Sequence, residues 1–432
     1  MDPVASTLST LDRPALEHVQ LDKLRALLGD VLQNNPFYRA KLAAAGLGDA
    51  GDLGTMEDYR RLPFTTRAEL SADQVDNPPY GTNLTCDVEH YTRIHQTSGT
   101  TGQRLRWLDT EASWEWWGRC WAQVYRGAGG GAGDRIFFAF SFGPFIGFWS
   151  ACEGARQLGA LIIPGGGMSS EQRLDALIEN DATVLVSTPT YALHLAEVAA
   201  DRNVDLPATQ IHTTVHAGEP GAGLPHTRQR LQEAWGARCF DHAGATEVGA
   251  WGFECREQAG LHFNEAEFIC EVIDPASGAP AADGELVVTN LGRHGMPVIR
   301  YRTGDRVTLQ HAPCACGLTF KRLAGGVSGR VDDALIVRGV IFYPSAIENI
   351  VRQFPHVTEF AVDIHRRGHL DELDVRLEIN GQADGVADQV AHAIRHHLGL
   401  RPAVHITAPN TLPRFELKAR RFTDHRTPGA NS

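Results

Sequence analysis

Long apolar runs are missing from this chain of 432 residues. None approaches the roughly 20 residues that a helix needs to span a bilayer. The segment from Met1 to Arg25 mixes acidic and basic residues and has no apolar signal core. Eight cysteines in a chain of this length, without a secretory signal, do not indicate a disulfide framework. We therefore expect a cytoplasmic protein with no membrane partner.

An excess of basic residues is also missing. The chain has 40 Lys and Arg against 52 Asp and Glu, a formal net charge of −12, which argues against a nucleic-acid partner. Internal repeats and low-complexity tracts are absent as well. With 43% hydrophobic and 21% charged residues, the composition is typical of a globular protein with a large core, and the length suits two or three domains.

The predicted secondary structure indicates an α/β fold. Residues 14–45 predict helices interrupted at Asn34–Pro36, and Thr66 with Glu69 predicts a helix N-terminus. From 111 to 241, helices alternate with short apolar strands, which predicts a parallel sheet with helices on both faces. The strands are expected at 135–140, 161–164, 183–187, 210–217 and 238–241, and the helices at 111–126, 147–158, 170–180, 189–200 and 224–235.

The pattern changes twice in the remaining sequence. Residues 267–325 are rich in β-formers punctuated by Gly and Asp, which predicts a small antiparallel subdomain. After Asp332 the predicted order is strand, helix, two strands, helix and strand, typical of a ferredoxin-like α+β unit of about 100 residues. Its strands are expected at 334–343, 358–365, 371–379 and 402–408, and its helices at 344–354 and 386–398. We therefore predict an N-terminal domain, 1–331, and a C-terminal domain, 332–432.

Five polar or Gly-rich motifs follow one another along this frame. They are Thr97-Ser98-Gly99-Thr100-Thr101-Gly102, Gly244-Ala245-Thr246-Glu247, Tyr301-Arg302-Thr303-Gly304-Asp305, Gly329-Arg330-Val331-Asp332-Asp333 and Leu417-Lys418-Ala419-Arg420. In this order they resemble the adenylate-forming acyl-CoA synthetase superfamily, most closely its phenylacetate-CoA ligase branch, over roughly residues 36–426. The resemblance implies that a carboxylate reacts with ATP to give an acyl-adenylate and pyrophosphate, and that the acyl group then passes to coenzyme A with release of AMP.

Activation of a carboxylate by ATP brings two anions together. The site therefore needs hydrogen-bond donors around the phosphates, a metal ion and a cation at the α-phosphate. The run 97–102 offers hydroxyl and amide donors, and its glycines permit close approach of the backbone. The family usually has Lys directly after this run, whereas this chain has Gln103 and Arg104. Arg104 or Arg106 can supply the charge, or the loop can act through its dipoles alone.

The resemblance also assigns roles within the ATP site. It implies that Glu247 holds Mg²⁺, with Thr246 beside the α-phosphate, because a hard cation prefers carboxylate oxygens. Asp305 is expected to accept the ribose hydroxyls, and Arg330 is expected to reach the ribose or a phosphate. Further residues are expected to border the adenine and the acyl group: Gly218, Glu219, Pro220, Asp241, His242, Ala243 and Gly244.

Lys418 aligns with the catalytic lysine of the family, whose ammonium group bridges the carboxylate and the α-phosphate. Leu417 stands where the family usually has glycine. Because a lysine placed there must leave before a thiol can attack, the resemblance implies a mobile C-terminal domain that pivots near Asp332.

The acyl pocket is predicted around Phe140-Ser141-Phe142-Gly143-Pro144-Phe145, which occupies the aromatic segment of phenylacetate-type ligases. The small residues Ala217, Ala243 and Gly244 leave a flat slot in which a ring can lie against the Phe faces. His216 or His242 can hydrogen-bond an ortho amino or hydroxyl group, and each fits equally well as a packing histidine. We therefore expect a small aromatic carboxylic acid: a substituted benzoate, such as an amino- or hydroxybenzoate, or a phenylacetate-like acid.

Four further residues suit a metal ion. Cys255, His262, Cys314 and Cys316 offer three thiolates and an imidazole, the ligand set of a tetrahedral structural Zn²⁺ site, and some relatives in the branch resemble the chain in this respect. His311 can replace His262, and reduced loop cysteines are the alternative. A zinc ion here would connect the loop that follows Glu247 with the loop that follows Asp305.

The sequence thus predicts an ATP- and Mg²⁺-dependent aryl-CoA ligase and leaves monomer and homodimer open. One alternative is an adenylating enzyme that loads an aryl acid onto a carrier protein or another acceptor. The other is a non-catalytic, nucleotide-binding regulatory relative, which the departures at Gln103 and Leu417 make conceivable.

Overall fold

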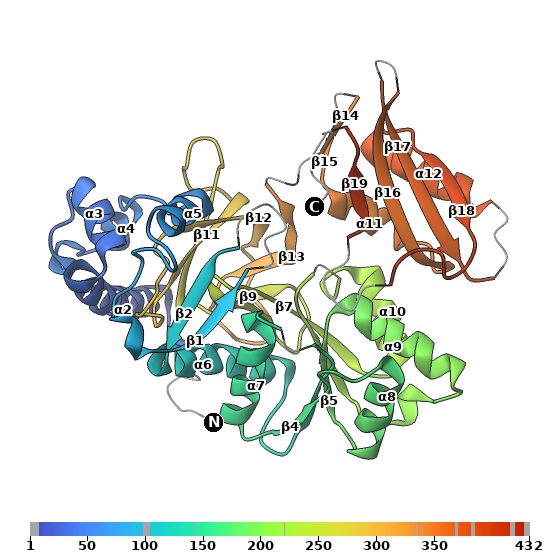
Figure 1. Cartoon of the computed structure of the whole chain (residues 1–432), viewed down its shortest axis with the longest axis horizontal. Coiled ribbons are helices and arrows are strands. Elements are labelled where there is room, and N and C mark those ends of the chain that lie inside the picture. The colour runs from blue at the N-terminus through green and yellow to red at the C-terminus, as the bar shows by residue number, and fades with distance from the viewer. Residues whose placement is uncertain are drawn as a thin grey trace.

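The computed structural model describes residues 8–97, 104–141, 143–219, 221–331, 333, 335–338, 340–367, 370–381, 385–414 and 420–426. In Figure 1 the residues up to Val331 form the larger body, and those from Leu335 onward form a smaller unit beside it. Several predicted site residues lie outside the described residues: Ser98 to Gly102, Phe142, Pro220, Asp332 and Lys418. None of the described helices combines the length and apolar character required to cross a membrane.

The helices at the start of the larger body follow the prediction. They are α2 (Arg13–Asn34), α3 (Pro36–Ala44) and α5 (Arg67–Asp76). The short helix α4 (Met56–Arg60) was not predicted. Asn35 separates α2 from α3, and its side chain accepts a hydrogen bond from the amide of Tyr38. The predicted capping box at the start of α5 is confirmed, because the side chains of Thr66 and Glu69 each accept a hydrogen bond from the other's amide.

The largest sheet among the described residues has eleven strands in the order β10-β11-β12-β13-β9-β8-β7-β6-β5-β3-β4. Its strands are β3 (Arg135–Phe138), β4 (Leu161–Pro164), β5 (Val184–Ser187), β6 (Thr213–His216), β7 (Arg238–Ala245), β8 (Gly249–Glu254), β9 (Leu261–Phe263), β10 (Phe268–Ile273), β11 (Asp283–Asn290), β12 (Tyr301–Gln310) and β13 (Arg322–Arg330). A separate hairpin of β1 (Tyr91–Gln96) and β2 (Arg106–Thr110) flanks the Ser/Thr/Gly run.

Helices cover both faces of the parallel strands, as the alternation predicts. One face is covered by α6 (Glu111–Ala128) and α7 (Ile146–Leu158), and the other by α8 (Ser170–Glu179), α9 (Pro189–Asp201) and α10 (Pro225–Trp235). Successive residues of β3 show why: Phe138 packs in the core with α6 and α7, whereas Phe137 packs in the core on the opposite face.

The antiparallel strands predicted at 267–325 are confirmed, but they do not form a subdomain apart from the main sheet. Strands β10 to β13 continue the main sheet through β9 and β8. The change of direction occurs within β7, where residues 238–241 pair with β6 in parallel and residues 242–245 pair with β8 in antiparallel fashion. Local sequence patterns indicate strands but not which strand becomes the neighbour. As a result, His242 to Gly244 lie where the sheet changes from parallel to antiparallel.

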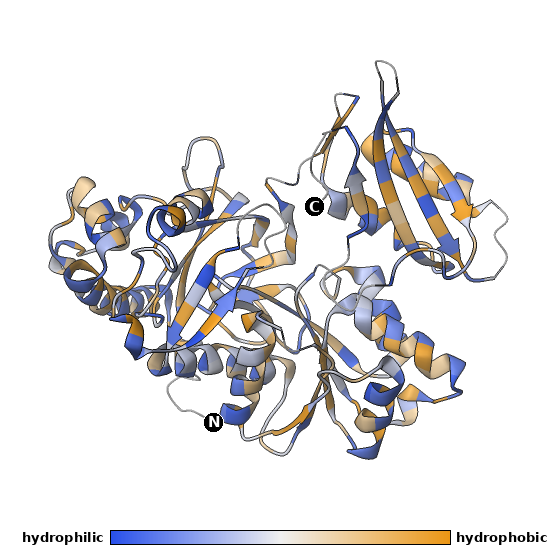
Figure 2. Ribbon diagram, in the orientation of Figure 1, coloured by the Kyte–Doolittle hydropathy of each residue, from blue (hydrophilic) through white to orange (hydrophobic). Residues whose placement is uncertain are grey.

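The smaller unit has a four-stranded sheet of order β18-β17-β16-β19. Its elements are α11 (Pro344–Val351), β16 (Val357–Arg367), β17 (Leu370–Ile379), α12 (Val386–Leu398), β18 (Ala403–Thr407) and β19 (Phe422–Asp424). Figure 2 shows hydrophobic and hydrophilic residues alternating along β16 and β17, as expected when one face of a sheet packs on helices.

The first strand predicted for this unit, 334–343, is wrong. Its residues form a separate hairpin of β14 (Leu335–Val337) and β15 (Val340–Phe342). Arg338 between them has a φ of +52°, and this left-handed turn reverses the chain in the middle of the predicted strand. The edge position beside β16 is taken by β19, which runs parallel to it.

Candidate active site

The Thr246–Glu247 pair lies in the turn between β7 and β8. Glu247 is 9% exposed, and its carboxylate accepts a hydrogen bond of 2.9 Å from Arg67 at the start of α5. The same guanidinium group donates to Oγ1 of Thr97, 3.3 Å away. Arg67 therefore joins the start of the Ser/Thr/Gly run to the predicted Mg²⁺ ligand. The sequence analysis missed Arg67, although it follows directly after the recognised capping residue.

Three consecutive carbonyl groups of this turn are bonded by side chains from the end of β11 and the loop that follows it. Arg293 donates from Nη1 to the carbonyl oxygens of Thr246 at 2.9 Å and Glu247 at 3.2 Å. Asn290 donates from Nδ2 to the carbonyl oxygen of Val248 at 3.0 Å. The backbone that presents Glu247 is therefore held by side chains as well as by strand hydrogen bonds.

Arg293 is itself fixed in a fully buried ion pair. Its Nε and Nη2 atoms each donate a hydrogen bond of 2.8 Å to one carboxylate oxygen of Asp109, and neither side chain is exposed. The guanidinium carbon lies 5.1 Å and 5.4 Å from the ring centres of Trp107 and Trp117. Such a bidentate, ring-stacked geometry is specific to arginine.

Asp305 and Arg330 lie opposite each other on β12 and β13, with Nη1 of Arg330 3.5 Å from a carboxylate oxygen of Asp305. The buried phenol of Tyr301 lies within the electrostatic influence of this pair, of Glu247 and of Arg67. Burial, with Glu247 as the next contribution, raises the pKa of Tyr301 well above its usual range. The structure therefore brings Glu247, Asp305 and Arg330 together around one side chain.

Two other predicted ATP-site residues have partners within the protein. Glu219 accepts a hydrogen bond of 3.0 Å from the amide of Thr190 in the first turn of α9. The carboxylate of Asp241 lies against a turn at Gly223, where a Cβ atom would be 2.6 Å from its Oδ2 atom. Burial and the neighbouring carboxylate of Glu254 raise the pKa of Asp241 well above its usual value. Gly218, with a φ of +93°, precedes Glu219 in a left-handed conformation that favours glycine.

The predicted acyl pocket is assembled only in part. Phe140 stacks on Phe148 with ring centres 3.4 Å apart, and Ala217 and Ala243 pack against the same core. Phe145 is the residue before α7 and is half-buried. His216 does not join this group. Its Nε2 atom is 2.9 Å from Oγ1 of Thr214, two residues earlier on β6, so it points to the face opposite that of its neighbour Ala217.

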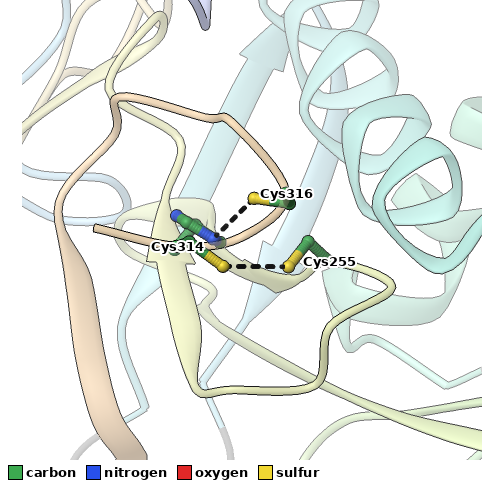
Figure 3. A group of neighbouring side chains, drawn as sticks. Cys255, Cys314 and Cys316 are labelled. Carbon is green, nitrogen blue, oxygen red and sulfur yellow. Dashed lines mark hydrogen bonds between the residues drawn. The ribbon is translucent and has the colours of Figure 1, made fainter. Parts of the chain in front are cut away.

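The four predicted zinc ligands come together. Their ligand atoms all lie within 4.8 Å of one another, and Figure 3 shows the three thiol groups converging. Sγ of Cys255 is 3.7 Å from Sγ of Cys314, and Sγ of Cys316 is 3.5 Å from Nε2 of His262. Tetrahedral ligands at Zn–S distances near 2.3 Å would be about 3.8 Å apart. The observed spacing therefore matches a zinc site and is far too long for a disulfide.

The surroundings of His262 also suit a metal ligand. Its Nδ1 atom is 3.2 Å from the carbonyl oxygen of Phe320, which can only accept, so Nδ1 carries the proton and Nε2 faces the thiols. Burial lowers the pKa of His262, which favours the neutral ring that a metal requires. The competing His311 is exposed and does not belong to the cluster.

A second group of metal-ligating types, Asp363, His365 and His425, lies on β16 and just after β19. The two imidazole rings are stacked, with centres 4.4 Å apart and planes only 7° from parallel. A metal ion lies in the plane of each imidazole that binds it, and one ion cannot lie in two stacked planes. We therefore assign this group to packing and to the ion pair of His425 with Asp363.

Comparison with known proteins agrees with this architecture. Residues 339–426 match the family model of the AMP-binding enzyme C-terminal domain. Over 442 aligned residues the chain is 32% identical to the phenylacetate-coenzyme A ligase of Escherichia coli (strain K12). The alignment covers 99% of this chain and 98% of that protein.

One solved relative has been captured in more than one state. The chain is similar to 2-hydroxyisobutyryl-CoA ligase in the postadenylation state, in complex with 2-HIB-AMP, with a TM-score of 0.91, 28% identity and coverage of 98% of this chain and 92% of that one. Against the same ligase in the thioesterification state with CoA, the TM-score is 0.74 at 29% identity, with coverage of 97% and 91%. The two parts of this chain are therefore arranged more like the postadenylation state. Because it is 32% identical to a phenylacetate-CoA ligase over nearly its full length, the chain belongs to the phenylacetate-CoA ligase family. Its members are ATP-dependent, AMP-forming acid–CoA ligases of the adenylate-forming superfamily.

Proposed function

We propose that this ligase activates an aromatic carboxylic acid, a substituted benzoate or a phenylacetate-like acid, and transfers the acyl group to coenzyme A. The observation that carries the proposal is the stack of Phe140 on Phe148, in the core where the small residues Ala217 and Ala243 also pack, together with the strand that leads to Thr246–Glu247. Flat aromatic faces next to small residues favour a planar ring. Relatives that span nearly the whole chain are phenylacetate-CoA ligases.

The charged groups suit the first half-reaction. Glu247 is the residue that would hold Mg²⁺, which when bound supplies positive charge to the phosphates. Asp305 would accept hydrogen bonds from the ribose hydroxyls, and Arg330 beside it would limit the repulsion between that carboxylate and the nucleotide. Arg67 holds the carboxylate of Glu247 in place and adds positive charge near the start of the phosphate loop.

A second substrate class has a specific observation in its favour. The solved relative that covers 98% of this chain is a 2-hydroxyisobutyryl-CoA ligase, and its substrate is a small branched hydroxy acid. The close stack of Phe148 on Phe140 would occupy part of an aromatic slot and leave room for a smaller acid.

A substrate panel separates the two classes. We expect acid-dependent exchange of pyrophosphate into ATP with benzoate, anthranilate, salicylate or phenylacetate, and a thioester product only when CoA is added. A kcat/KM at least about tenfold higher for one of these aromatic acids than for 2-hydroxyisobutyrate would support the proposal, since that ratio corresponds to about 1.4 kcal/mol of differential binding. A preference for 2-hydroxyisobutyrate would overturn it.

We also propose that Cys255, His262, Cys314 and Cys316 hold a structural zinc ion. The proposal rests on the tetrahedral spacing of the ligand atoms and on the tautomer of His262. A four-ligand site leaves no position open for substrate, so the ion would stabilise the fold and not take part in catalysis. It would tie β8 and β9 to the loop between β12 and β13.

Elemental analysis should find about one zinc ion per chain, and removal of zinc with a strong chelator should lower the Tm by roughly 5 °C or more. Cys314→Ser should lose both the zinc and the stability. Cys86→Ser is the matched control, because Cys86 is an exposed free cysteine outside the cluster. A protein purified without zinc that melts at the same temperature with or without the chelator would show that these are reduced loop cysteines.

A further inference from the structure

His242 lies on β7, three residues before this strand ends at Ala245 and the chain turns at Thr246–Glu247. Its ring packs 4.3 Å from the ring of Trp121, on the α6 side of the sheet. Its Nδ1 atom lies 2.6 Å from the carbonyl oxygen of Gly252 on β8. The orientation of the imidazole is therefore fixed from two sides.

The hydrogen bond to Gly252 decides which ring nitrogen carries the proton. A carbonyl oxygen can only accept, so Nδ1 of His242 must be the donor. Burial lowers the pKa of His242 to about 4, so the ring is neutral near pH 7. Nε2 therefore presents a lone pair and acts only as an acceptor.

The Nε2 atom of the buried His242 lies beside the backbone of Gly244. Gly244 is exposed, and a Cβ atom there would lie 3.3 Å from Nε2 and 2.8 Å from the carbonyl oxygen of Gly249. Any larger residue at position 244 would cover this nitrogen. Within the described part of the chain, no group hydrogen-bonds to Nε2. The ring thus offers an oriented, unused acceptor four residues before Thr246.

We propose that His242 makes the enzyme select carboxylic acids that carry a neutral hydrogen-bond donor, an amino or hydroxyl group, close to the carboxylate. The inference rests on the proposed function, because it takes the space over Gly244 as part of the acyl pocket. An amino or hydroxyl group there would pair with Nε2, whereas a methyl group would remove water from the acceptor and leave it unpaired. A carboxylate oxygen and the lone pair of Nε2 are both acceptors and would repel each other. The carboxylate end of the acid is therefore directed away from His242.

The donor is expected near the carboxylate because the distances are short. Gly244 and Thr246 are two residues apart, a separation of about 7 Å along an extended chain. The carboxylate that reacts beside Thr246 and the substituent that meets Nε2 must fit within this span. An ortho substituent satisfies this requirement best.

The test compares amino- and methylbenzoates, because the two substituents have nearly the same size. We expect the wild-type enzyme to prefer 2-aminobenzoate over 2-methylbenzoate by about 10- to 100-fold in kcat/KM. His242→Leu should reduce this preference to about threefold or less, mainly through loss of activity on the aminobenzoate. His242→Gln, which can place an amide oxygen near the position of Nε2, should keep part of the preference and serves as a second variant if leucine impairs folding.

His216→Leu is the matched control, since it removes a buried neutral histidine from the opposite face of the same sheet, and it should leave the preference unchanged. The meta and para pairs are measured in parallel. The inference is overturned if no amino/methyl preference at any ring position depends on His242. If none of the acids releases AMP, the proposed function fails instead, so the two failures are distinguishable.

Discussion

Replacing Arg293 with methionine should cost about 3–5 kcal/mol of stability and should lower the rate of adenylation by more than the unfolded fraction explains. Methionine fills much of the space of the arginine stem but leaves the carboxylate of Asp109 buried without its bidentate partner, with only Nδ1 of His95 4.0 Å away. It also removes the donor that bonds the carbonyl groups of Thr246 and Glu247. A displacement of about 1 Å at a reacting group can reduce the rate about 100-fold.

A double variant separates the two effects. Asp109→Leu combined with Arg293→Met removes both charges, and replacement of a whole buried ion pair by apolar groups is often neutral or stabilising. We expect this variant to regain most of the stability and little of the adenylation rate, because the carbonyl groups of the turn still lack their donor. Thermal unfolding and pyrophosphate exchange measure the two properties independently. Recovery of both would show that Arg293 serves stability alone.

Arg300→Met provides a matched control for Arg293→Met. Arg300 also forms a nearly buried bidentate pair, with Glu271, and also donates to backbone carbonyl groups, but these belong to Arg60 and Leu62. We expect a comparable loss of stability and normal adenylation per folded molecule. Equal losses of adenylation in both variants would refute a specific positioning role for Arg293.

The motif residues of the site could be predicted from the sequence, whereas the role of Arg293 could not. The motif residues Glu247, Asp305 and Arg330 are recognisable because each lies in a short, ordered pattern, and the structure brings them together. Asp109 and Arg293 are 184 positions apart, and neither lies in a pattern that names its partner. Their relation depends on how β2 packs beside the loop after β11, which is a property of the fold and has no local signal.

The same distinction explains the outcome for the secondary structure. The alternation of helices and strands between 111 and 241 was predictable because each segment buries a face with its own periodicity. The edge strand of the C-terminal sheet was not, because β19 has only three residues and its neighbour β16 ends 55 positions earlier in the chain, at Arg367. A turn at Arg338 broke the strand predicted there, and a φ of +52° at a non-glycine residue has no reliable signature in the sequence.

The segment that carries Lys418 is anchored on both sides by buried ion pairs. Before it, Arg414 donates to the fully buried carboxylate of Glu378 at 2.7 Å. After it, Arg421 pairs with Glu359 at 2.6 Å and also donates to Oγ1 of Thr190 on the larger body, 3.1 Å away. Thr190 is the residue whose amide bonds Glu219 in the predicted ATP site. Arg414 also lies 3.8 Å from the carboxylate of Glu197 on α9. The described residues on either side of Lys418 are therefore fixed to the smaller unit, and both sides also contact the larger one.

Lys418→Ala should lower the rate of adenylation about 10²- to 10³-fold, the usual loss when one oriented group that stabilises transition-state charge is removed. The carboxylate and the α-phosphate are both anions, and the ammonium group of Lys418 is expected to bridge them. The family resemblance assigns this role to no other residue of the C-terminal motif. Transfer of the acyl group from added acyl-adenylate to CoA should be largely retained, because the lysine must leave the site before the thiol attacks. Pyrophosphate exchange measures the first step, and thioester formation from acyl-adenylate measures the second.

Arg420→Ala is the matched control for Lys418→Ala, since it removes an exposed positive charge two residues away and should change neither step appreciably. Lys418→Arg should restore little adenylation, because a planar guanidinium group does not reproduce a compact ammonium charge between two anions. If Lys418→Ala slowed both steps equally, the lysine would be needed in both arrangements of the two parts. The need to remove the lysine before the thiol attacks would then give no reason for the pivot predicted near Asp332.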